Sequence, residues 1–143
     1  MLPFMDNVFL DSSWFKAIID NKDEFFDKAS LILDKFEKDK TDLVTSNFIV
    51  DETFTLVRVK CSLEKCVELR EFLKELGNKL HIERVRVADE RLAWDWFWKD
   101  WSRLSFTDCT CFAVMERLGL TRVATFDDHF ERAGFEIVSA KNE

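Results

Sequence analysis

The stretch Asn7-Val-Phe-Leu-Asp11 decides the fold class, because it is a short apolar run closed by an acidic residue. An apolar run of this length, without alternating polar positions, is typical of a strand that is buried on both faces of a sheet. The next stretch, Ser12 to Asp20, has the pattern of a helix start. The chain therefore opens its regular structure with a strand that leads directly into a helix, as parallel α/β folds do.

The same alternation continues along the whole chain. Further helices are predicted at 23–38, 47–60, 62–76, 88–101, 107–118 and 128–133, and further strands at 43–45, 80–87, 122–126 and 136–139. Asn47 and Ser62 are expected to cap two of these helices. Strands that alternate with helices predict a single α/β domain over residues 1–143, with helices on both faces of one parallel sheet of four or five strands. In such sheets, ligands bind at the edge formed by the carboxyl ends of the strands.

Composition excludes several classes of protein. The chain has 143 residues, with 28 acidic against 21 basic side chains and a formal net charge of −7. This balance argues against a passive nucleic-acid binder held by bulk charge, but not against a nuclease whose metal ions supply positive charge. The longest apolar run, from Cys111 to Met115, is far shorter than the ~20 residues of a transmembrane helix. The N-terminus shows no basic region followed by an apolar stretch, so we expect neither a membrane segment nor a secretory signal.

Cysteine and histidine usage points to a reducing environment without a zinc site. The four cysteines, at 61, 66, 109 and 111, form no CxxC pair and no zinc-knuckle spacing. We expect them to be small buried or half-buried thiols in the cytoplasm. His81 and His129 are the two histidines, which makes a His-based zinc site or a Ser-His-Asp triad hard to build.

Three aspartates are predicted to meet at the carboxyl edge of the sheet. Asp11 ends the first strand, Asp127 follows the strand at 122–126, and Asp108 opens the helix that leads into that strand. Each of them has an alternative explanation as a helix-capping or first-turn acid. Their joint position at one edge favours a shared site.

Glu52 is a fourth candidate for the site. Its neighbours at helical spacing are Phe48, Leu56 and Val59, which predicts that Glu52 lies in the middle of an apolar stripe. A buried carboxylate without a partner is strongly unfavourable. The alternatives are a Glu at the edge of the stripe, paired with a Lys or Arg, or a metal site. Three or four converging carboxylates are typical of a Mg²⁺ or Mn²⁺ site.

Four motifs resemble the PIN-domain ribonucleases, and in particular the VapC-type toxins of toxin–antitoxin pairs. They are Val8-Phe-Leu-Asp11-Ser-Ser, Thr45-Ser-Asn-Phe-Ile-Val-Asp-Glu52-Thr, Leu104-Ser-Phe-Thr-Asp108-Cys and Ala124-Thr-Phe-Asp127-Asp-His-Phe130. The resemblance implies a three-layer α/β/α fold with strand order 3-2-1-4-5. It also implies that Asp11, Glu52, Asp108 and Asp127 form the family's acidic quartet, with Thr125 as its small hydroxyl residue.

The function implied by the resemblance is Mg²⁺- or Mn²⁺-dependent hydrolysis of RNA phosphodiester bonds by a cytoplasmic endoribonuclease. The carboxylates would hold one or two ions, and Thr125 would orient a ligand or a water. Asp128 is interpreted as an acid that favours the helix dipole rather than as a ligand. The family usually dimerises and is silenced by an antitoxin protein, so a homodimer and an antitoxin are the expected partners. An RNA-maturation nuclease and a non-catalytic binding module remain as alternatives.

Four of the five tryptophans lie in the stretch Trp94-Asp-Trp-Phe-Trp-Lys-Asp-Trp101. Helical spacing places Trp94, Phe97, Trp98 and Trp101 on one face, while Trp96 points elsewhere and is expected to be partly exposed. This face has three alternative roles: ordinary core, a protein interface, or a platform on which RNA bases stack. We predict that this segment or its neighbours form part of a homodimer interface.

Overall fold

The computed structural model describes residue 4 and residues 6–141 of the chain. Within this part, five parallel strands form one sheet in the order β3-β2-β1-β4-β5. The strands are β1 (Val8–Leu10), β2 (Leu43–Ser46), β3 (Leu80–Glu83), β4 (Arg122–Ala124) and β5 (Glu136–Ile137). The predicted fold class and the strand order implied by the resemblance are confirmed.

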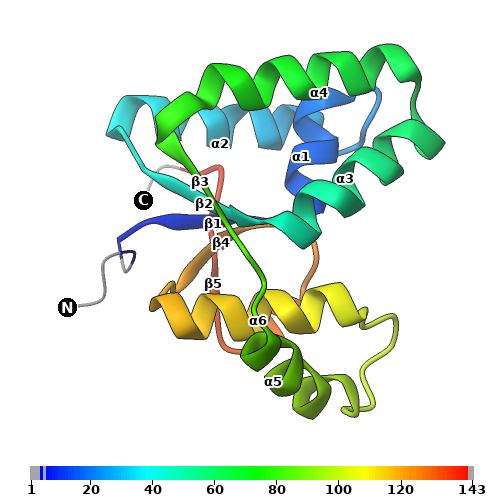
Figure 1. Cartoon of the computed structure of the whole chain (residues 1–143). Helices are drawn as coiled ribbons and strands as arrows, with labels where there is room; N and C mark the ends of the chain where they lie inside the picture. Colours follow the sequence, from blue (N-terminus) through cyan, green and yellow to red (C-terminus); the bar gives the residue numbers. More distant parts are fainter. Residues whose placement is uncertain (1–3, 5, 142–143) are drawn as a thin grey trace.

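Helices cover both faces of the sheet, so the molecule has three layers (Figure 1). One layer contains α1 (Ser12–Ile19), α2 (Phe26–Asp39), α3 (Asn47–Lys60) and α4 (Leu63–Leu76), which is followed by the short 3₁₀ helix η1 (Gly77–Lys79). The opposite layer contains α5 (Val87–Phe97) and α6 (Phe106–Leu118), and α7 (His129–Arg132) packs against α6. No helix in the described part of the chain is long and apolar enough to cross a membrane.

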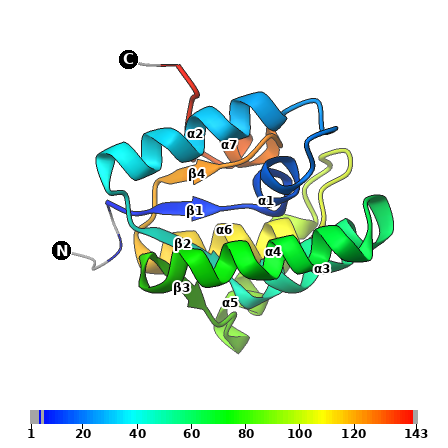
Figure 2. The ribbon, with the colours of Figure 1, turned by 90° about the horizontal axis from the view of Figure 1, so that it is seen from above.

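The chain changes direction across the sheet between β1 and β4. It first builds β1, β2 and β3 toward one side, and then returns through α5 and α6 to place β4 against the free side of β1. β1 and β4 are therefore neighbours, with Leu10 opposite Ala124. Figure 2 shows these two strands side by side beneath α2. The segments that follow β1 and β4 consequently emerge next to each other, at the point where α/β sheets bind ligands.

The core explains why β1 is apolar throughout. All three residues of β1 are fully buried, because the helical layers cover both of its faces. In α6 every residue from Asp108 to Met115 is buried, since this helix lies between the sheet, α5 and α7. A helix that is apolar all round is typical of such a position.

An ion-pair network fixes α5 and α6 to the edge strand β3. The Arg117 guanidinium donates to the buried Asp89 carboxylate at 2.9 Å and to Glu83 Oε2 at 2.6 Å. Burial alone would raise the pKa of Asp89, but the contacts with Arg117 and the backbone N–H of Arg86 hold it below its usual value. The charged Asp89 is thus stabilised by a partner that also positions the second helical layer.

Some local predictions differ from the structure. Ser46 rather than Asn47 caps α3, because the Ser46 hydroxyl accepts the N–H of Ile49. The Asn47 side chain instead accepts the N–H of Val85 at 2.8 Å, and so ties the segment after β3 to the start of α3. The predicted cap Ser62 is confirmed, since its hydroxyl accepts the N–H of Lys65. The prediction that Asn47 caps this helix was therefore wrong by one residue, because the Asn47 side chain is engaged by Val85 instead.

Candidate functional site

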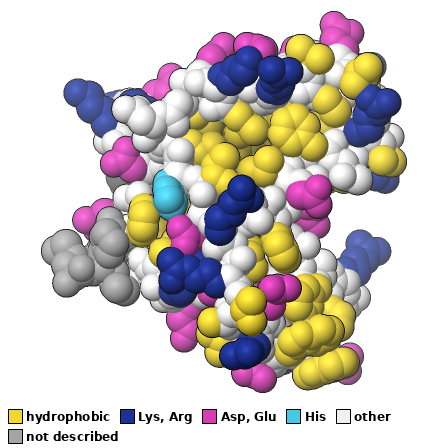
Figure 3. Space-filling view, in the orientation of Figure 1, with side chains coloured by type: hydrophobic (Ala, Val, Ile, Leu, Met, Phe, Trp, Pro, Cys, Tyr) yellow, Lys and Arg dark blue, Asp and Glu magenta, His cyan; other side chains and the backbone are white. Residues whose placement is uncertain are grey.

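The candidate site lies at the carboxyl ends of β1 and β4. Asp11 follows β1 and Asp127 lies shortly after β4, while Asp108 belongs to the first turn of α6 and Glu52 to α3. Figure 3 shows the molecule hollowed between its two helical layers. The topology therefore brings four distant segments of the sequence to one edge, as predicted.

Asp11 is held by two hydroxyl groups on one oxygen only. Its Oδ2 accepts hydrogen bonds from Thr125 Oγ1 at 2.7 Å and from Ser13 Oγ at 2.9 Å. Its Oδ1 is buried without a hydrogen-bond partner. Asp11 is only 2% exposed, and this burial, together with the nearby charge of Asp127, raises its pKa above the usual value despite the two hydroxyls. One carboxylate oxygen is thus fixed, and the other is free for a ligand.

Thr125 and Ser13 join the two strand ends. Thr125 Oγ1 also accepts the N–H of Asp127 at 3.0 Å, and Ser13 Oγ accepts the N–H of Phe126 at 2.9 Å. Thr125 was predicted to have an orienting role, and its contact with Asp11 is consistent with that. Ser13 was not assigned a role from the sequence; the signal was its position two residues after Asp11 in the first motif.

Asp108 combines a structural and an electrostatic role. It forms a capping box with Ser105, in which the Ser105 hydroxyl accepts the N–H of Asp108 and the Asp108 carboxylate accepts the N–H of Ser105. Burial, followed by the charges of Asp11 and Asp127, raises the pKa of Asp108 to about 7. The capping explanation and the site explanation are therefore both compatible with this residue.

Glu52 lies near the other carboxylates, but the predicted apolar stripe was wrong. The buried face of α3 consists of Ile49, Thr53 and Val57, whereas Val59 is 74% exposed. Glu52 is half-buried beside that face. Its pKa is raised by burial and by the charges of Asp11 and Asp127, while the nearby Ser12 hydroxyl lowers it.

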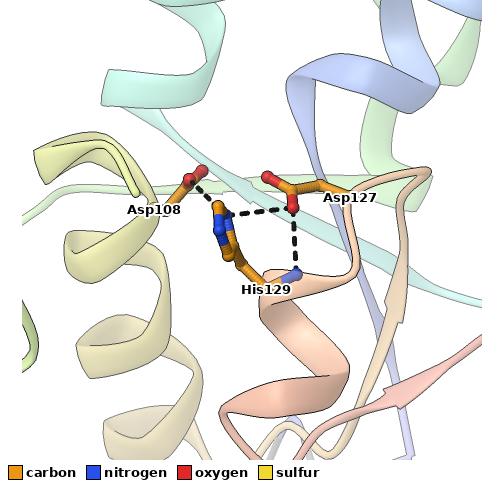
Figure 4. Close-up of side chains that lie close together, drawn as sticks. All are labelled: Asp108, Asp127 and His129. Atoms are coloured by element: carbon orange, nitrogen blue, oxygen red, sulfur yellow. Dashed lines mark hydrogen bonds and ion pairs between the residues drawn. The ribbon is translucent and has the colours of Figure 1, made fainter. Parts of the chain in front are cut away.

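A tight cluster of three ligand atoms includes a histidine that sequence reasoning missed. Single side-chain atoms of Asp108, Asp127 and His129 all lie within 4.8 Å of one another (Figure 4). Asp11 and Glu52 lie outside this cluster, although their charges affect Asp108. Neither histidine was predicted to be a ligand, because two histidines make a His-based zinc site hard to build. The signal that could have identified His129 was its spacing of two residues from Asp127.

Trp101, which lies beside this cluster, departs from the predicted helix face. Because α5 ends at Phe97, Trp101 leaves the face predicted for it and stacks on the His129 ring, with centroids 6.2 Å apart and an interplanar angle of 13°. Trp96 is partly exposed, as expected, and packs on the core residue Phe112. Asp128 is exposed, occupies the N-cap position of α7 and makes no capping hydrogen bond.

An apolar patch lies on the second helical layer. Trp94 and Trp98 are 47% and 74% exposed, and their rings stack with centroids 5.5 Å apart. Leu92 and Val87 on the same helix are also exposed. Figure 3 shows hydrophobic side chains gathered over this layer. The predicted homodimer contact stays a prediction.

The donor set of the site fits a divalent cation. Its charged groups are carboxylates, which are the ligands that hard cations prefer. Burial and mutual repulsion raise the pKa of Asp11, Glu52 and Asp108 above their usual values. A cation among them would reverse the repulsion, and the unpartnered Oδ1 of Asp11 would gain a partner.

Comparison with known proteins finds similar sequences and similar folds. The model of the PIN domain family matches residues 8–136. A 94-residue region, which covers 65% of this chain and 70% of the relative, is 34% identical to the 23S rRNA-specific endonuclease VapC20 of Mycobacterium tuberculosis. The resemblance stated from the four motifs is therefore confirmed.

Solved structures share the fold. The crystal structure of the Sarcin-Ricin loop cleaving toxin VapC20 of Mycobacterium tuberculosis has a TM-score of 0.80 at 30% identity, over 93% of this chain and 99% of that one. DNA-bound VapBC of Salmonella typhimurium has a TM-score of 0.66 at 15% identity, over 96% of this chain and 100% of that one. FitAcB of Neisseria gonorrhoeae has a TM-score of 0.63 at 18% identity, over 93% and 97%. The last two, at their low identities, support the fold alone.

Proposed function

The chain belongs to the PIN-domain family, and on that premise we propose that it is a metal-dependent endoribonuclease that hydrolyses RNA phosphodiester bonds. The observation that carries this proposal is the convergence of Asp11, Glu52, Asp108 and Asp127, in which burial and the neighbouring charges raise the pKa values of the first three. A protein that used this edge only for packing would have no reason to gather uncompensated carboxylates there.

We assign the four carboxylates as ligands for Mg²⁺ or Mn²⁺. When bound, such a cation lowers the pKa of a water molecule and offsets the negative charge on the scissile phosphate. The protein's own contribution is positioning: Thr125 and Ser13 fix Oδ2 of Asp11, and the capping box with Ser105 fixes Asp108 at the start of α6. These contacts hold the ligands in place before a substrate arrives.

The relatives support a proposal for the substrate class and the partner. Because a relative with 34% identity is a 23S rRNA-specific endonuclease, we propose ribosomal RNA as the substrate of this chain. We also propose that it is the toxin of a type II toxin–antitoxin pair in the cytoplasm, that an antitoxin protein binds it, and that it forms a homodimer. The exposed Trp94 and Trp98 support an interface on α5, and the four free cysteines suit a reducing compartment.

An RNA-maturation nuclease outside a toxin pair would use the same site, and a non-catalytic module would not. The buried, unpartnered Oδ1 of Asp11 favours catalysis, since a module without a metal would leave that atom unsatisfied. A neighbouring reading frame that encodes a small protein with a DNA-binding start would separate the toxin from a maturation enzyme.

The test compares wild type with Asp11→Asn on ribosomal RNA in Mg²⁺, Mn²⁺ or EDTA. We expect cleavage by the wild type with either metal and none in EDTA, because the phosphate charge is then not offset. Asp11→Asn keeps the size of the side chain but removes a charged ligand, so it should reduce cleavage by orders of magnitude. Asp128→Asn is the matched control: it removes an exposed carboxylate close to Asp127 and should leave the rate unchanged. Cleavage by Asp11→Asn at the wild-type rate, or cleavage in EDTA, would refute the proposal.

A further inference from the structure

The imidazole of His129 is held in one orientation and one tautomer. Its Nε2 lies 2.7 Å from the backbone oxygen of Ser102. A carbonyl oxygen only accepts hydrogen bonds, so Nε2 is the nitrogen that carries the hydrogen. The ring is stacked against Trp101 on one side, and the Arg132 guanidinium lies over the Trp101 ring at 5.0 Å. In the neutral ring, Nδ1 therefore presents a lone pair.

The Nδ1 atom faces two carboxylates without a hydrogen bond to either. It lies 3.1 Å from Asp127 Oδ1 and 3.7 Å from Asp108 Oδ2 (Figure 4). His129 is only 8% exposed, and Nδ1 is buried without a hydrogen-bond partner. The same Oδ1 of Asp127 already accepts the backbone N–H of His129 at 2.9 Å. A lone pair buried between two anionic groups is unfavourable, and either a proton on Nδ1 or a cation among the three groups would relieve it.

We propose that His129 Nδ1 is a ligand of the divalent cation, together with Asp108 and Asp127. The spacing supports this, because two ligands at right angles, each ~2.1 Å from an ion, lie about 3 Å apart. The contact between His129 Nδ1 and Asp127 Oδ1, at 3.1 Å, has this separation. The Ser102 carbonyl completes the pattern, since a metal-bound histidine almost always donates its other N–H to a carbonyl or a carboxylate.

A nitrogen ligand changes which ion the site prefers. Mg²⁺ prefers an all-oxygen set, whereas imidazole suits transition metals. His129 should therefore favour Mn²⁺ over Mg²⁺ at this position. This inference rests on the proposed nuclease function, because it takes the acidic site to be a cation site.

The test uses electron spin echo envelope modulation of the Mn²⁺-loaded protein, which detects a nitrogen nucleus bound to the ion. We expect a ¹⁴N signal in the wild type, which changes to the ¹⁵N pattern when only the histidines carry ¹⁵N. His129→Gln should lose the signal and weaken Mn²⁺ binding by roughly 10- to 100-fold, with a smaller effect on Mg²⁺. His81→Gln is the matched control: it removes the other histidine, which is exposed and bonded to Glu83, and should keep both the signal and the affinity.

The wild-type experiment needs no variant, so misfolding of His129→Gln would not leave the proposal untested. A Mn²⁺-loaded wild type without histidine nitrogen coupling overturns it, as does a signal that survives in His129→Gln. If the wild type binds Mn²⁺ and cleaves RNA but shows no such coupling, the ligand assignment alone fails. If it neither binds Mn²⁺ nor cleaves RNA in its presence, the proposed function fails as well.

Discussion

Replacement of Asp108 by Asn should stabilise the metal-free protein at neutral pH while it abolishes cleavage. Asp108 has its pKa raised from 3.8 to about 7, first by burial and then by the charges of Asp11 and Asp127. The unfolded chain ionises this carboxyl freely, whereas the folded protein does so only near pH 7. Asn has the same shape, carries no charge, and keeps an oxygen that accepts the N–H of Ser105.

The size of the effect follows from the shift in pKa. A difference of about three pKa units, at ~1.36 kcal/mol per unit, corresponds to about 4 kcal/mol of lost stability at pH 7. This is an upper bound, because the Asp11 carboxyl, whose pKa is also raised, can take up a proton and relieve part of the repulsion. The folded pKa lies above the unfolded one, so this destabilisation is absent below about pH 4. It grows as the pH rises to about 7 and is constant above that. The difference in free energy of unfolding between Asp108→Asn and the wild type should depend on pH in the same way.

Urea unfolding in EDTA at pH 4 and pH 7.5 measures this gap, and the same experiment in saturating Mn²⁺ provides the second comparison. Metal stabilises the folded wild type in proportion to its affinity, so Mn²⁺ should close or invert the gap. If Asp108 served only to cap α6, the Asp108→Asn variant would be as stable as the wild type or less stable at every pH. Mn²⁺ would then leave the difference in free energy of unfolding unchanged. Either of those outcomes would contradict the electrostatic account.

Four further predictions follow from the structure. Thr125→Val should lower stability by about 1–3 kcal/mol and impair cleavage, because it removes one of the two hydroxyl donors to the buried Asp11 carboxylate and the acceptor of the Asp127 N–H; Thr125→Ser should recover both in urea unfolding and RNA assays. Arg117→Met should destabilise by roughly 3–5 kcal/mol in urea, since it leaves buried Asp89 without its partner. EDTA should lower the melting temperature of the wild type measured in Mn²⁺, and an unchanged value would speak against a bound cation. Trp98→Ser should convert the expected homodimer to a monomer in sedimentation at tens of micromolar, and an unchanged sedimentation coefficient would place the interface elsewhere.

Local pattern was enough to predict a parallel sheet with helices on both faces, whereas the strand order came from the resemblance to the PIN-domain family. The fully apolar run at Val8–Leu10 indicates a strand covered on both faces, and the alternation of strands with helices leaves few alternatives to a parallel sheet. Asp11, Asp108 and Asp127 could be placed at one edge from the sequence, because each lies where a strand ends or a helix begins. The geometric rule that collects these positions at one edge does not depend on side-chain detail.

Glu52 shows the limit of helical periodicity. The spacing pointed to a stripe through Phe48, Leu56 and Val59, but α3 buries the neighbouring face with Ile49, Thr53 and Val57. Periodicity gives the width of an apolar face, and the packing of α1 and α4 against α3 decided which rotation is buried. Glu52 was predicted to lie near the site, and it does, but the apolar stripe on which that prediction was based is not the buried face of α3.

His129 shows what only the tertiary structure decided. The sequence by itself determined a parallel α/β sheet, its carboxyl edge and the acidic residues at that edge, because these follow from contacts between neighbouring residues and from the handedness of the crossovers. The orientation of the His129 ring depends on the Ser102 carbonyl and the Trp101 indole, which belong to the segment between α5 and α6. No local pattern predicts contacts between His129 and residues so much earlier in the sequence. The direction in which its Nδ1 points, toward Asp108 and Asp127, therefore follows only from the tertiary structure.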